Sequence, residues 1–412
     1  MAKYVKTEQG YIDIPTNFAP PPFKPAGKSY LTFSSISSFT LAVNDRAKHW
    51  DGTLEYFTSD KTWATWDGTT TLSAVDDDGE YFLYLRGTGN TIITGNSTGY
   101  KWILTGTDIK CIGNIENLLD YATVESGAHP TMANYCYWFM FQSCTGLTQA
   151  PALPATTLAD YCYSHMFDSC TNLIHAHALP AKTLARSCCD GMFYGCTSLT
   201  QAPSLPATTL AAQCYSNMFQ SCTGLTQAPA LPATTLADYC YSGMFQSCTS
   251  LAQAPSLPAT TLANGCYFNM FLSCTALTQV PSLPATTLAN SCCETMFGDC
   301  TSLKLSSTQT DEYTQEYRIT SSGNGITATN ALNGMFASTG GTFTGTPEIN
   351  TTYYLSSDNM IIRDTELATL NGYVKAMIEA SEYIIPSSTS GSTKKFKITV
   401  DDTGTISATE VT

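Results

Sequence analysis

Residues 222–247 read CTGLTQAPALPATTLADYCYSGMFQS, and close copies of this 26-residue repeat stand on both sides of it. A Met-Phe pair marks each copy and recurs every 26 residues, at Met140, Met166, Met192, Met218, Met244, Met270 and Met296. A fixed period of this length is typical of stacked coils, because one repeat alone cannot bury its apolar face. The sequence therefore predicts a solenoid of 26-residue coils.

Fourteen of the seventeen cysteines follow the same period and form two columns. We expect both columns in the core, since cysteine behaves as a small apolar side chain that can stack on its copy in the next coil. The expected core residues are Cys144, Cys170, Cys196, Cys222, Cys248, Cys274, Met218, Phe219, Met244 and Phe245. The odd number of cysteines and their repeat positions argue against a disulfide framework. The repetition also argues against a catalytic thiol, because an active site occurs once.

Two segments of different pattern make up each repeat. Apolar side chains spaced by four, at Leu236, Cys240 and Met244, predict a short helix over residues 236–247. Residues 225–229 predict a strand that carries proline at its end. Because proline cannot donate to a sheet ladder, we expect this strand to span only two or three residues.

The phrases LPATTLADYCYSGMFQSCTSL and MFQSCTGLTQAPALPATTLA resemble BspA-like leucine-rich repeats, surface-protein repeats of gut bacteria and their phages. The resemblance covers residues 112–345 and implies a leucine-rich-repeat fold. It also implies adhesion, with binding of proteins or glycans rather than catalysis. Residues 113–120 resemble the N-terminal cap of the family, and residues 330–340 resemble its closing cap.

The flanks of the repeats predict three further segments. Residues 1–29 include three consecutive prolines and predict an extended Pro-rich arm. Residues 30–112 hold short β-rich runs such as TLEYF, EYFLYLRG and NTIIT, and predict an immunoglobulin-like β-sandwich. Residues 346–412 predict an amphipathic helix from Asp364 to Ala380, a Ser/Thr/Gly linker, and a hairpin of FKITV and TISATEV. With the solenoid over residues 113–345, the expected fold class is multidomain α+β.

Charge and hydropathy exclude two classes of partner. The chain has 19 Lys and Arg against 33 Asp and Glu, a net charge of −14, and only 13% charged residues. Nucleic acids and anionic membranes require clustered cations, so we expect neither as a partner. The first twenty residues hold no apolar run of seven or more, and no stretch approaches the roughly 20 apolar residues of a membrane span. We therefore expect synthesis in a cytoplasm, without a secretory signal and without membrane insertion.

Two clusters suggest a metal site. His175 and His177 lie two apart on a strand and can face the same way, and residues 76–80 (DDDGE) concentrate carboxylates as a calcium loop does. The alternatives are an exposed strand face for the histidines and a solvated turn for the carboxylates, and we expect no metal and no cofactor. The G-x-S-x-G and H-E-x-x-H motifs are absent, so the sequence predicts a protein that is not an enzyme.

The remaining candidate is a binding surface on the repeats. Its expected ligand-binding residues are Gln149, His175, Gln201, Gln227, Gln253 and Gln279 on the strand face, with Tyr161, Tyr239 and Phe268 at variable helix positions. Amides beside aromatic rings can hydrogen-bond a glycan or a neutral protein surface. The alternative is that these positions are simply solvated.

Adhesion-type repeats without an export signal predict a virion protein, since virions assemble in the host cytoplasm and leave by lysis. The ending STKKFKITVDDTGTISATEVT also resembles the ends of phage structural proteins. We expect a homo-oligomer on the virion surface, in contact with other virion proteins, that attaches to a glycan or protein receptor on the bacterial surface. A tail fibre and a head fibre both satisfy this expectation. The alternatives are a capsid decoration or cement protein and a bacterial cell-surface adhesin.

Overall fold

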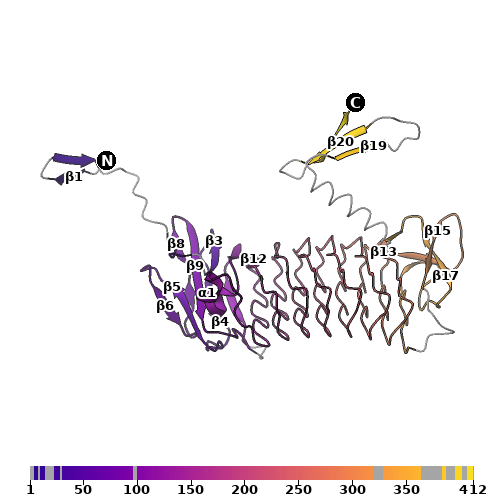
Figure 1. Ribbon diagram of the computed structural model, residues 1–412, viewed down its shortest axis with the longest axis horizontal. Helices are drawn as coiled ribbons and strands as arrows, with labels where there is room; N and C mark the ends of the chain where they lie inside the picture. Colours follow the sequence, from indigo (N-terminus) through magenta and orange to yellow (C-terminus); the bar gives the residue numbers. More distant parts are fainter. Residues whose placement is uncertain are drawn as a thin grey trace. The chain divides into compact units, whose positions relative to one another are not determined.

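The computed structural model describes residues 4–7, 10–13, 23–27, 30–95, 100–319, 328–362, 383–386, 395–400 and 406–411. The chain divides into two compact units, the first Met1–Leu205 with Ala211–Leu225 and the second Pro206–Leu210 with Thr226–Thr412. Over the described residues the fold is mostly β, with several separate sheets and one helix, α1 (Asn117–Glu125) (Figure 1). The division falls inside the repeats.

The first unit begins with two facing sheets. The seven-stranded sheet has the order β12-β11-β3-β9-β5-β6, with β8 also paired to β9, and the three-stranded sheet has the order β10-β4-β7. Their strands are β3 (Leu31–Ser35), β4 (Thr40–Val43), β5 (Thr53–Phe57), β6 (Trp63–Trp66), β7 (Leu72–Ser73), β8 (Val75–Asp77), β9 (Glu80–Thr88), β10 (Trp102–Thr105), β11 (Ile109–Ile112) and β12 (Leu147–Gln149). Trp66 of β6 and Trp102 of β10 pack edge-to-face with centroids 5.6 Å apart, so the two sheets share one core.

One predicted strand of this region is absent. Residues 90–94 (NTIIT) form no strand. Instead, the backbone N–H groups of Ile93 and Thr94 both donate to the carbonyl of Cys136, at 2.9 and 3.1 Å. The prediction was wrong because these donors bond a turn of the first repeat rather than a neighbouring strand.

The N-terminal segment is not an extended arm throughout. Strands β1 (Tyr4–Thr7) and β2 (Gly10–Asp13) pair antiparallel as a separate two-stranded sheet. Phe23 is only 4% exposed and packs on the rings of Phe57 and Tyr84. The prediction of an extended arm over residues 1–29 is therefore wrong at two places. It relied on the proline content, whereas the polar-apolar alternation of β1 and β2 favours strands and the apolar area of Phe23 favours burial.

The predicted helix over residues 236–247 is wrong. Every fourth residue has a left-handed backbone, with φ of 56° at Tyr239, 60° at Gly243 and 61° at Ser247. The Ser242 N–H donates within its turn to the Tyr239 carbonyl, whereas the Tyr239 N–H donates at 2.8 Å to Asn264 in the next repeat. The segment is a series of four-residue turns, and this turn period has the same spacing of apolar side chains as a helix face.

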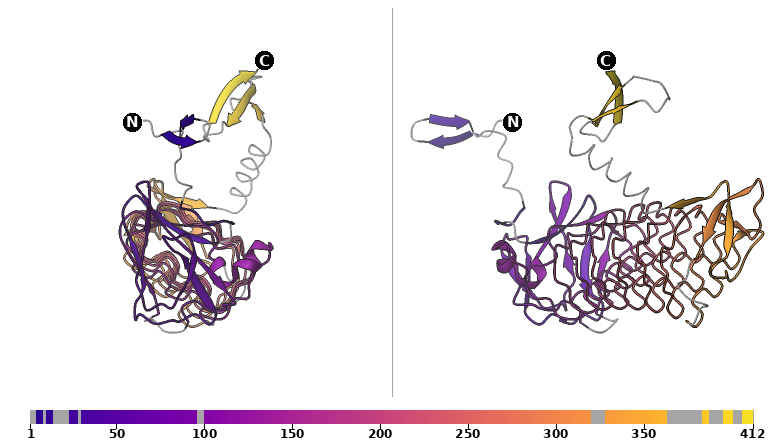
Figure 2. Two further views of the ribbon diagram at one scale, coloured as in Figure 1. Left: turned by 90° about the vertical axis from the view of Figure 1, so that its left-hand side faces the viewer. Right: turned by 45° about the vertical axis from the view of Figure 1, so that its right-hand side comes forward.

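In the first unit the same turns bond side by side. The N–H groups of alternate residues donate to residues 25 positions later, in the pairs Tyr135–Asp160, Tyr137–Cys162, Phe139–Ser164, Phe141–Met166 and Ser143–Asp168, at 2.7–3.1 Å. The pattern recurs from Tyr161 to Ser169 and from Ser187 to Gly195. Within each unit, successive repeats therefore lie side by side, as the parallel turns in Figure 2 show.

The core of the repeats consists of stacked phenylalanines and thiols. Phe141, Phe167 and Phe193 stack face to face with centroids 5.5–5.6 Å apart. The residues expected in the core are all at most 2% exposed: Cys144, Cys170, Cys196, Cys222, Cys248, Cys274, Met218, Phe219, Met244 and Phe245. All seventeen cysteines are buried as reduced thiols. Burial raises the pKa of most of them, including Cys170 and Cys196, so these thiols stay protonated at neutral pH.

The cysteine column that runs from Cys144 to Cys300 at 26-residue intervals also donates hydrogen bonds. In the first unit the Sγ of Cys170, Cys196 and Cys222 lies 3.0–3.2 Å from the carbonyl of a phenylalanine 29 residues earlier. In the second unit Cys274 and Cys300 make the same contact at 3.0 Å. The column therefore uses the S–H group as a donor in addition to the small apolar volume of the side chain.

In the first unit, the facing sheets close the open edge of the first repeat. The Trp102 N–H donates to Met140 at 2.8 Å, and the Ile109 N–H donates to Gly146 at 2.8 Å. Strand β11 continues this contact as a parallel pair with β12. Within residues 113–120, which were expected to form the cap, the carbonyl of Gly113 accepts the Ala152 N–H. The first repeat is therefore bonded both by this segment and by the sheets before it.

In the second unit the last repeat bonds to residues 329–337. Alternate N–H groups from Ser291 to Asp299 donate to carbonyls from Thr329 to Ala337, 38 residues later. The Phe336 N–H in turn donates to Gly345 at 2.8 Å. The segment expected as a closing cap, residues 330–340, therefore receives the bonds of a further repeat after an insertion.

Residues 304–318, between the last repeat and residue 329, form small sheets of the second unit together with residues 340–362. Strands β14 (Lys304–Ser306), β15 (Tyr313–Arg318), β16 (Gly340–Gly341) and β17 (Thr352–Ser356) make one sheet, and β13 (Gln279–Pro281) pairs parallel with β18 (Met360–Ile362). Strand β17 thus pairs with β14 and β15, and strand β18 pairs with β13 of the repeats. The strands β19 (Tyr383–Pro386), β20 (Lys395–Val400) and β21 (Ile406–Val411) form a third sheet, in which β20 and β21 pair antiparallel as the terminal alternation predicts. The expected helix from Asp364 to Ala380 lies outside the described residues.

Candidate binding surfaces

The predicted glutamine row follows the strand segments. In the first unit His175 and Gln201 are exposed, Gln149 is half-buried, and Gln149 and His175 form a parallel bridge. In the second unit Gln227 and Gln253 are exposed, and Gln253 bridges to the half-buried Gln279. Bridged neighbours stand about 4.8 Å apart, the strand spacing of a sheet. Each unit therefore presents polar side chains that can hydrogen-bond at the repeat spacing.

The predicted aromatic residues lie on the turn segments instead. Tyr161 has a φ of 60° and stacks on Tyr135 with centroids 4.7 Å apart. Tyr239 is 42% exposed, and its ring lies over Gly265 of the next repeat, where an added Cβ would overlap it. Phe268 is half-buried. In the described residues these rings and the glutamine row share no hydrogen bond or ring contact, so the predicted residues form two separate surfaces.

Residues just before the turns have a structural role that the sequence did not reveal. The Oδ1 of Asp160 accepts the Arg186 N–H at 3.0 Å, and the Oδ1 of Asp238 accepts the Asn264 N–H at 3.1 Å. Asn134, Asn264 and Asn290 accept the equivalent N–H groups of the repeats that follow them. Asp and Asn at this position supply the same acceptor oxygen, whereas Arg186 and Ala212 at the equivalent positions have none.

A histidine lies between two repeats in the first unit. The His165 ring stacks on Phe139 at 4.7 Å and lies over Gly191, where an added Cβ would overlap it. Its Nδ1 is 3.2 Å from Asp168. Burial raises the pKa of Asp168, but hydrogen bonds from His165, Ser169 and Gln142 outweigh it, and the net shift is downward. The cluster satisfies its own polar groups and joins neighbouring repeats.

The two clusters considered as metal sites have different surroundings. His175 and His177 are both exposed. The carboxylates of residues 76–80 lie in the β8–β9 hairpin, where the Oδ1 of Asp76 accepts the Gly79 N–H at 2.9 Å. Across the part of the chain that the structure describes, no group of three His, Cys, Asp or Glu side chains is placed to hold a metal ion.

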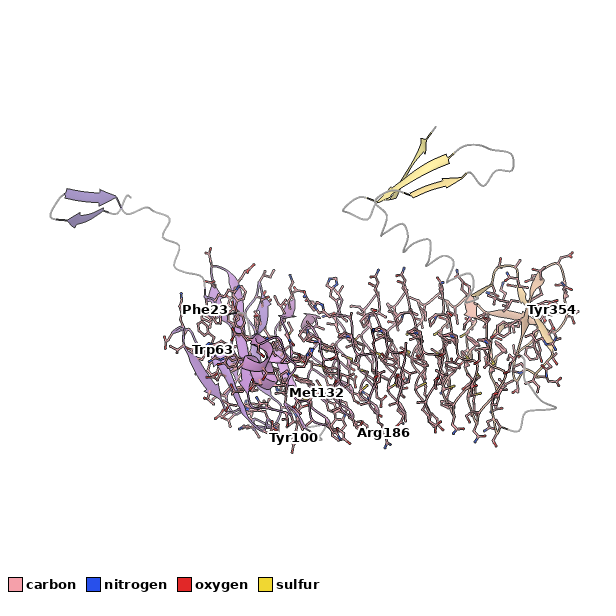
Figure 3. The ribbon with its side chains drawn as sticks, in the orientation of Figure 1. Phe23, Trp63, Tyr100, Met132, Arg186 and Tyr354 are labelled. Atoms are coloured by element: carbon pink, nitrogen blue, oxygen red, sulfur yellow. The ribbon has the colours of Figure 1, made fainter. Side chains whose placement is uncertain are left out.

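A pocket of about 440 Å³, which the sequence did not predict, lies in the first unit. Its lining comprises Phe23, Lys24, Gly27, Tyr30, Thr32, Asp77, Phe82, Tyr84, Ile112 and Gly113. Phe23 and Trp63, labelled in Figure 3, belong to the aromatic cluster beside it, in which Phe57 contacts both rings. The alternation of aromatic residues in EYFLYLRG was a signal for this pocket, because it places Phe82 and Tyr84 on one face of β9.

Comparisons with known proteins found no match to this chain. No protein-family model matches it, and neither the curated proteins nor the solved structures include a match. In the described residues, no helix combines the length and the apolar character that a membrane crossing requires.

Proposed function

We propose that the repeats form a BspA-like leucine-rich-repeat solenoid, preceded by an immunoglobulin-like β-sandwich. Support comes from the 26-residue period: within each unit, parallel bridges join equivalent residues of neighbouring repeats, and the backbone bonds of the turns join residues 25 positions apart. Strands of three residues, as in β12 and β13, also fit this class. The turn segments stand where the spacing of apolar side chains predicted a short helix.

We propose further that the protein is a non-enzymatic component of a phage virion surface that attaches to a glycan or protein on the bacterial host. The observation that carries this proposal is the glutamine row, whose exposed amides recur at the repeat spacing. From Cys144 to Cys300 the sequence has only eight charged residues. Such a surface favours contacts that depend on shape and hydrogen bonds over salt-sensitive attraction.

Two alternatives lead to different observations. A capsid decoration or cement protein would use the same rows against neighbouring virion proteins, and a bacterial adhesin would be found on cells without phage particles. Mass spectrometry of purified virions distinguishes the adhesin, since only a virion protein is present in the particles. Binding of the purified chain to intact cells distinguishes the cement protein, which would bind none.

The test uses the fluorescently labelled full chain and a panel of intact gut-bacterial cells. Gln201→Glu with Gln253→Glu places two charges on the glutamine row, and Thr208→Glu with Thr260→Glu adds the same charge at exposed threonines outside it. We expect binding to one or more strains, lost in the glutamine variant and retained in the threonine variant. Equal binding by both variants would show that attachment does not use the glutamine row.

A further inference from the structure

We propose that the pocket of the first unit is a binding site for a neutral hexose, such as the terminal sugar of a glycan. The site lies on the β-sheets and not on the repeats, so the inference goes beyond the proposed attachment surface. It rests on how the floor, the walls and the charges of the pocket combine.

The floor of the pocket is one face of three neighbouring strands. Ile112 of β11 pairs with Thr32 of β3, and Thr32 pairs with Tyr84 of β9, so these three side chains lie in a row across the sheet. Phe82 lies two residues before Tyr84 on the same face, with its ring within 6° of parallel to that of Tyr84. Phe82 is half-buried and Ile112 is exposed, so both offer apolar surface to a ligand. The C–H face of a sugar ring packs on such aromatic and aliphatic surface.

The wall of the pocket is held in place by polar contacts. The Phe23 N–H donates to the Oδ2 of Asp77 at 2.9 Å, and the Tyr84 hydroxyl donates to the Phe23 carbonyl at 3.0 Å. Tyr30 packs edge-to-face on Tyr84 with centroids 5.3 Å apart. These contacts preorganise the pocket, so a ligand need not order this segment when it binds.

The charged groups favour a neutral ligand that has both donors and acceptors. The second carboxylate oxygen of Asp77 can accept a ligand hydroxyl, and the ammonium group of Lys24 can donate to one. The two charges cancel, so neither a cation nor an anion gains a net attraction within the lining. The volume also falls within the range of small-molecule sites, about 300–1,000 Å³. Hydroxyl groups around an apolar ring face match this combination.

Saturation-transfer NMR and calorimetry on the full chain test the site with glucose, galactose, mannose and N-acetylglucosamine. Glucosamine and glucuronate serve as cationic and anionic counterparts. We expect one or more neutral sugars to bind, and the charged counterpart of the same sugar to bind more weakly. Absence of binding by every neutral sugar, or tighter binding of a charged one, would overturn the proposal.

Variants place the binding in this pocket. Phe82→Ala removes the ring surface and should weaken binding by about tenfold, the typical value of one aromatic contact. Asp77→Asn retains an oxygen that can accept the Phe23 N–H but removes the charge, and we expect a similar loss. Tyr81→Ala is the matched control, because Tyr81 lies next to Phe82 on β9 but points to the opposite face and is not part of the lining.

Phe82→Ala and Asp77→Asn test the sugar site separately from the proposed attachment through the glutamine row. Sugar binding that is unchanged in both Phe82→Ala and Asp77→Asn would contradict the assignment even if cells still bind the chain. Cell binding that fails while the sugar still binds would contradict only the proposed attachment.

Discussion

The buried thiols should make the fold unstable at alkaline pH. Burial raises the pKa of Cys144 to about 11 and that of Cys222 and Cys274 to about 12. An exposed thiol has a pKa of about 8.5, so the unfolded chain loses these protons first. The stabilisation from each thiol is therefore complete below about pH 8.5 and is lost as the pH rises toward the value in the folded chain.

These three thiols give the order of magnitude of the expected loss of stability. Each pH unit between the two pKa values removes about 1.4 kcal/mol of stability per thiol, so each thiol contributes a loss of about 2 kcal/mol at pH 10. The sum, about 6 kcal/mol, is comparable with the total free energy of unfolding of a typical domain, about 5–15 kcal/mol. Burial raises the pKa of further thiols such as Cys170, Cys196 and Cys300, which adds to the loss. We expect the urea midpoint to fall markedly between pH 7.5 and pH 10.

The assay is urea unfolding followed by circular dichroism at pH 7.5, 9 and 10, with a non-thiol reductant present. Cys222→Ala is the informative variant, because it removes the thiol without leaving its acceptor unpaired. The Phe193 carbonyl, which accepts from the Cys222 thiol, still accepts the Cys196 N–H in the variant. Its stability should fall less steeply with pH, by about 1.4 kcal/mol per pH unit. A urea midpoint that is the same at pH 7.5 and pH 10 would refute the reasoning.

Three further predictions concern stability and thiol access. Gly265→Ala should cost about 1–3 kcal/mol of unfolding free energy, because the new Cβ overlaps the Tyr239 ring, whereas Gly89→Ala, with a similar φ of 62° and open space, should cost less; equal urea midpoints would contradict this. Asp238→Ala should lose about 1 kcal/mol with the acceptor of the Asn264 N–H, and Asp238→Asn should retain most of it, as measured by urea unfolding. At pH 7.5 an aromatic disulfide reagent should modify none of the seventeen thiols of the folded chain and all of them in urea, and rapid modification of the folded chain would show that the repeats open.

The period was the part of the fold that the sequence could predict, because it does not depend on the conformation within a repeat. The conformation itself could not be predicted from apolar spacing, since Leu236, Cys240 and Met244 fit both a helix face and a series of four-residue turns. A better signal was Gly243 and Ser247, spaced by four, which recur as glycine, asparagine or serine at many equivalent positions. Glycine and asparagine adopt the left-handed backbone more readily than other residues.

The candidate surfaces were predictable to a different extent. The glutamine row follows from the strand pattern alone, because alternate side chains of a strand share a face. The pocket depends on Phe23, whose contact with Tyr84 joins residues 61 positions apart, and no local pattern reports such a contact. Tyr161 and Tyr239 look like ligand contacts in the sequence, yet each ring covers a neighbouring repeat, so part of its surface is used for stacking.

The scarcity of charge in the repeats also follows from the way they bond. Equivalent residues of adjacent repeats stand about 4.8 Å apart, a distance at which like charges repel by about 1 kcal/mol even in water. Between Cys144 and Cys300 no charged residue is followed 26 positions later by one of the same sign, and Asp160 is followed by Arg186. Stacking of the repeats therefore requires columns of neutral side chains, whether or not a ligand binds to them. The amides of the glutamine row satisfy this condition and still offer hydrogen bonds to a partner, which a row of carboxylates could not do without destabilising the fold.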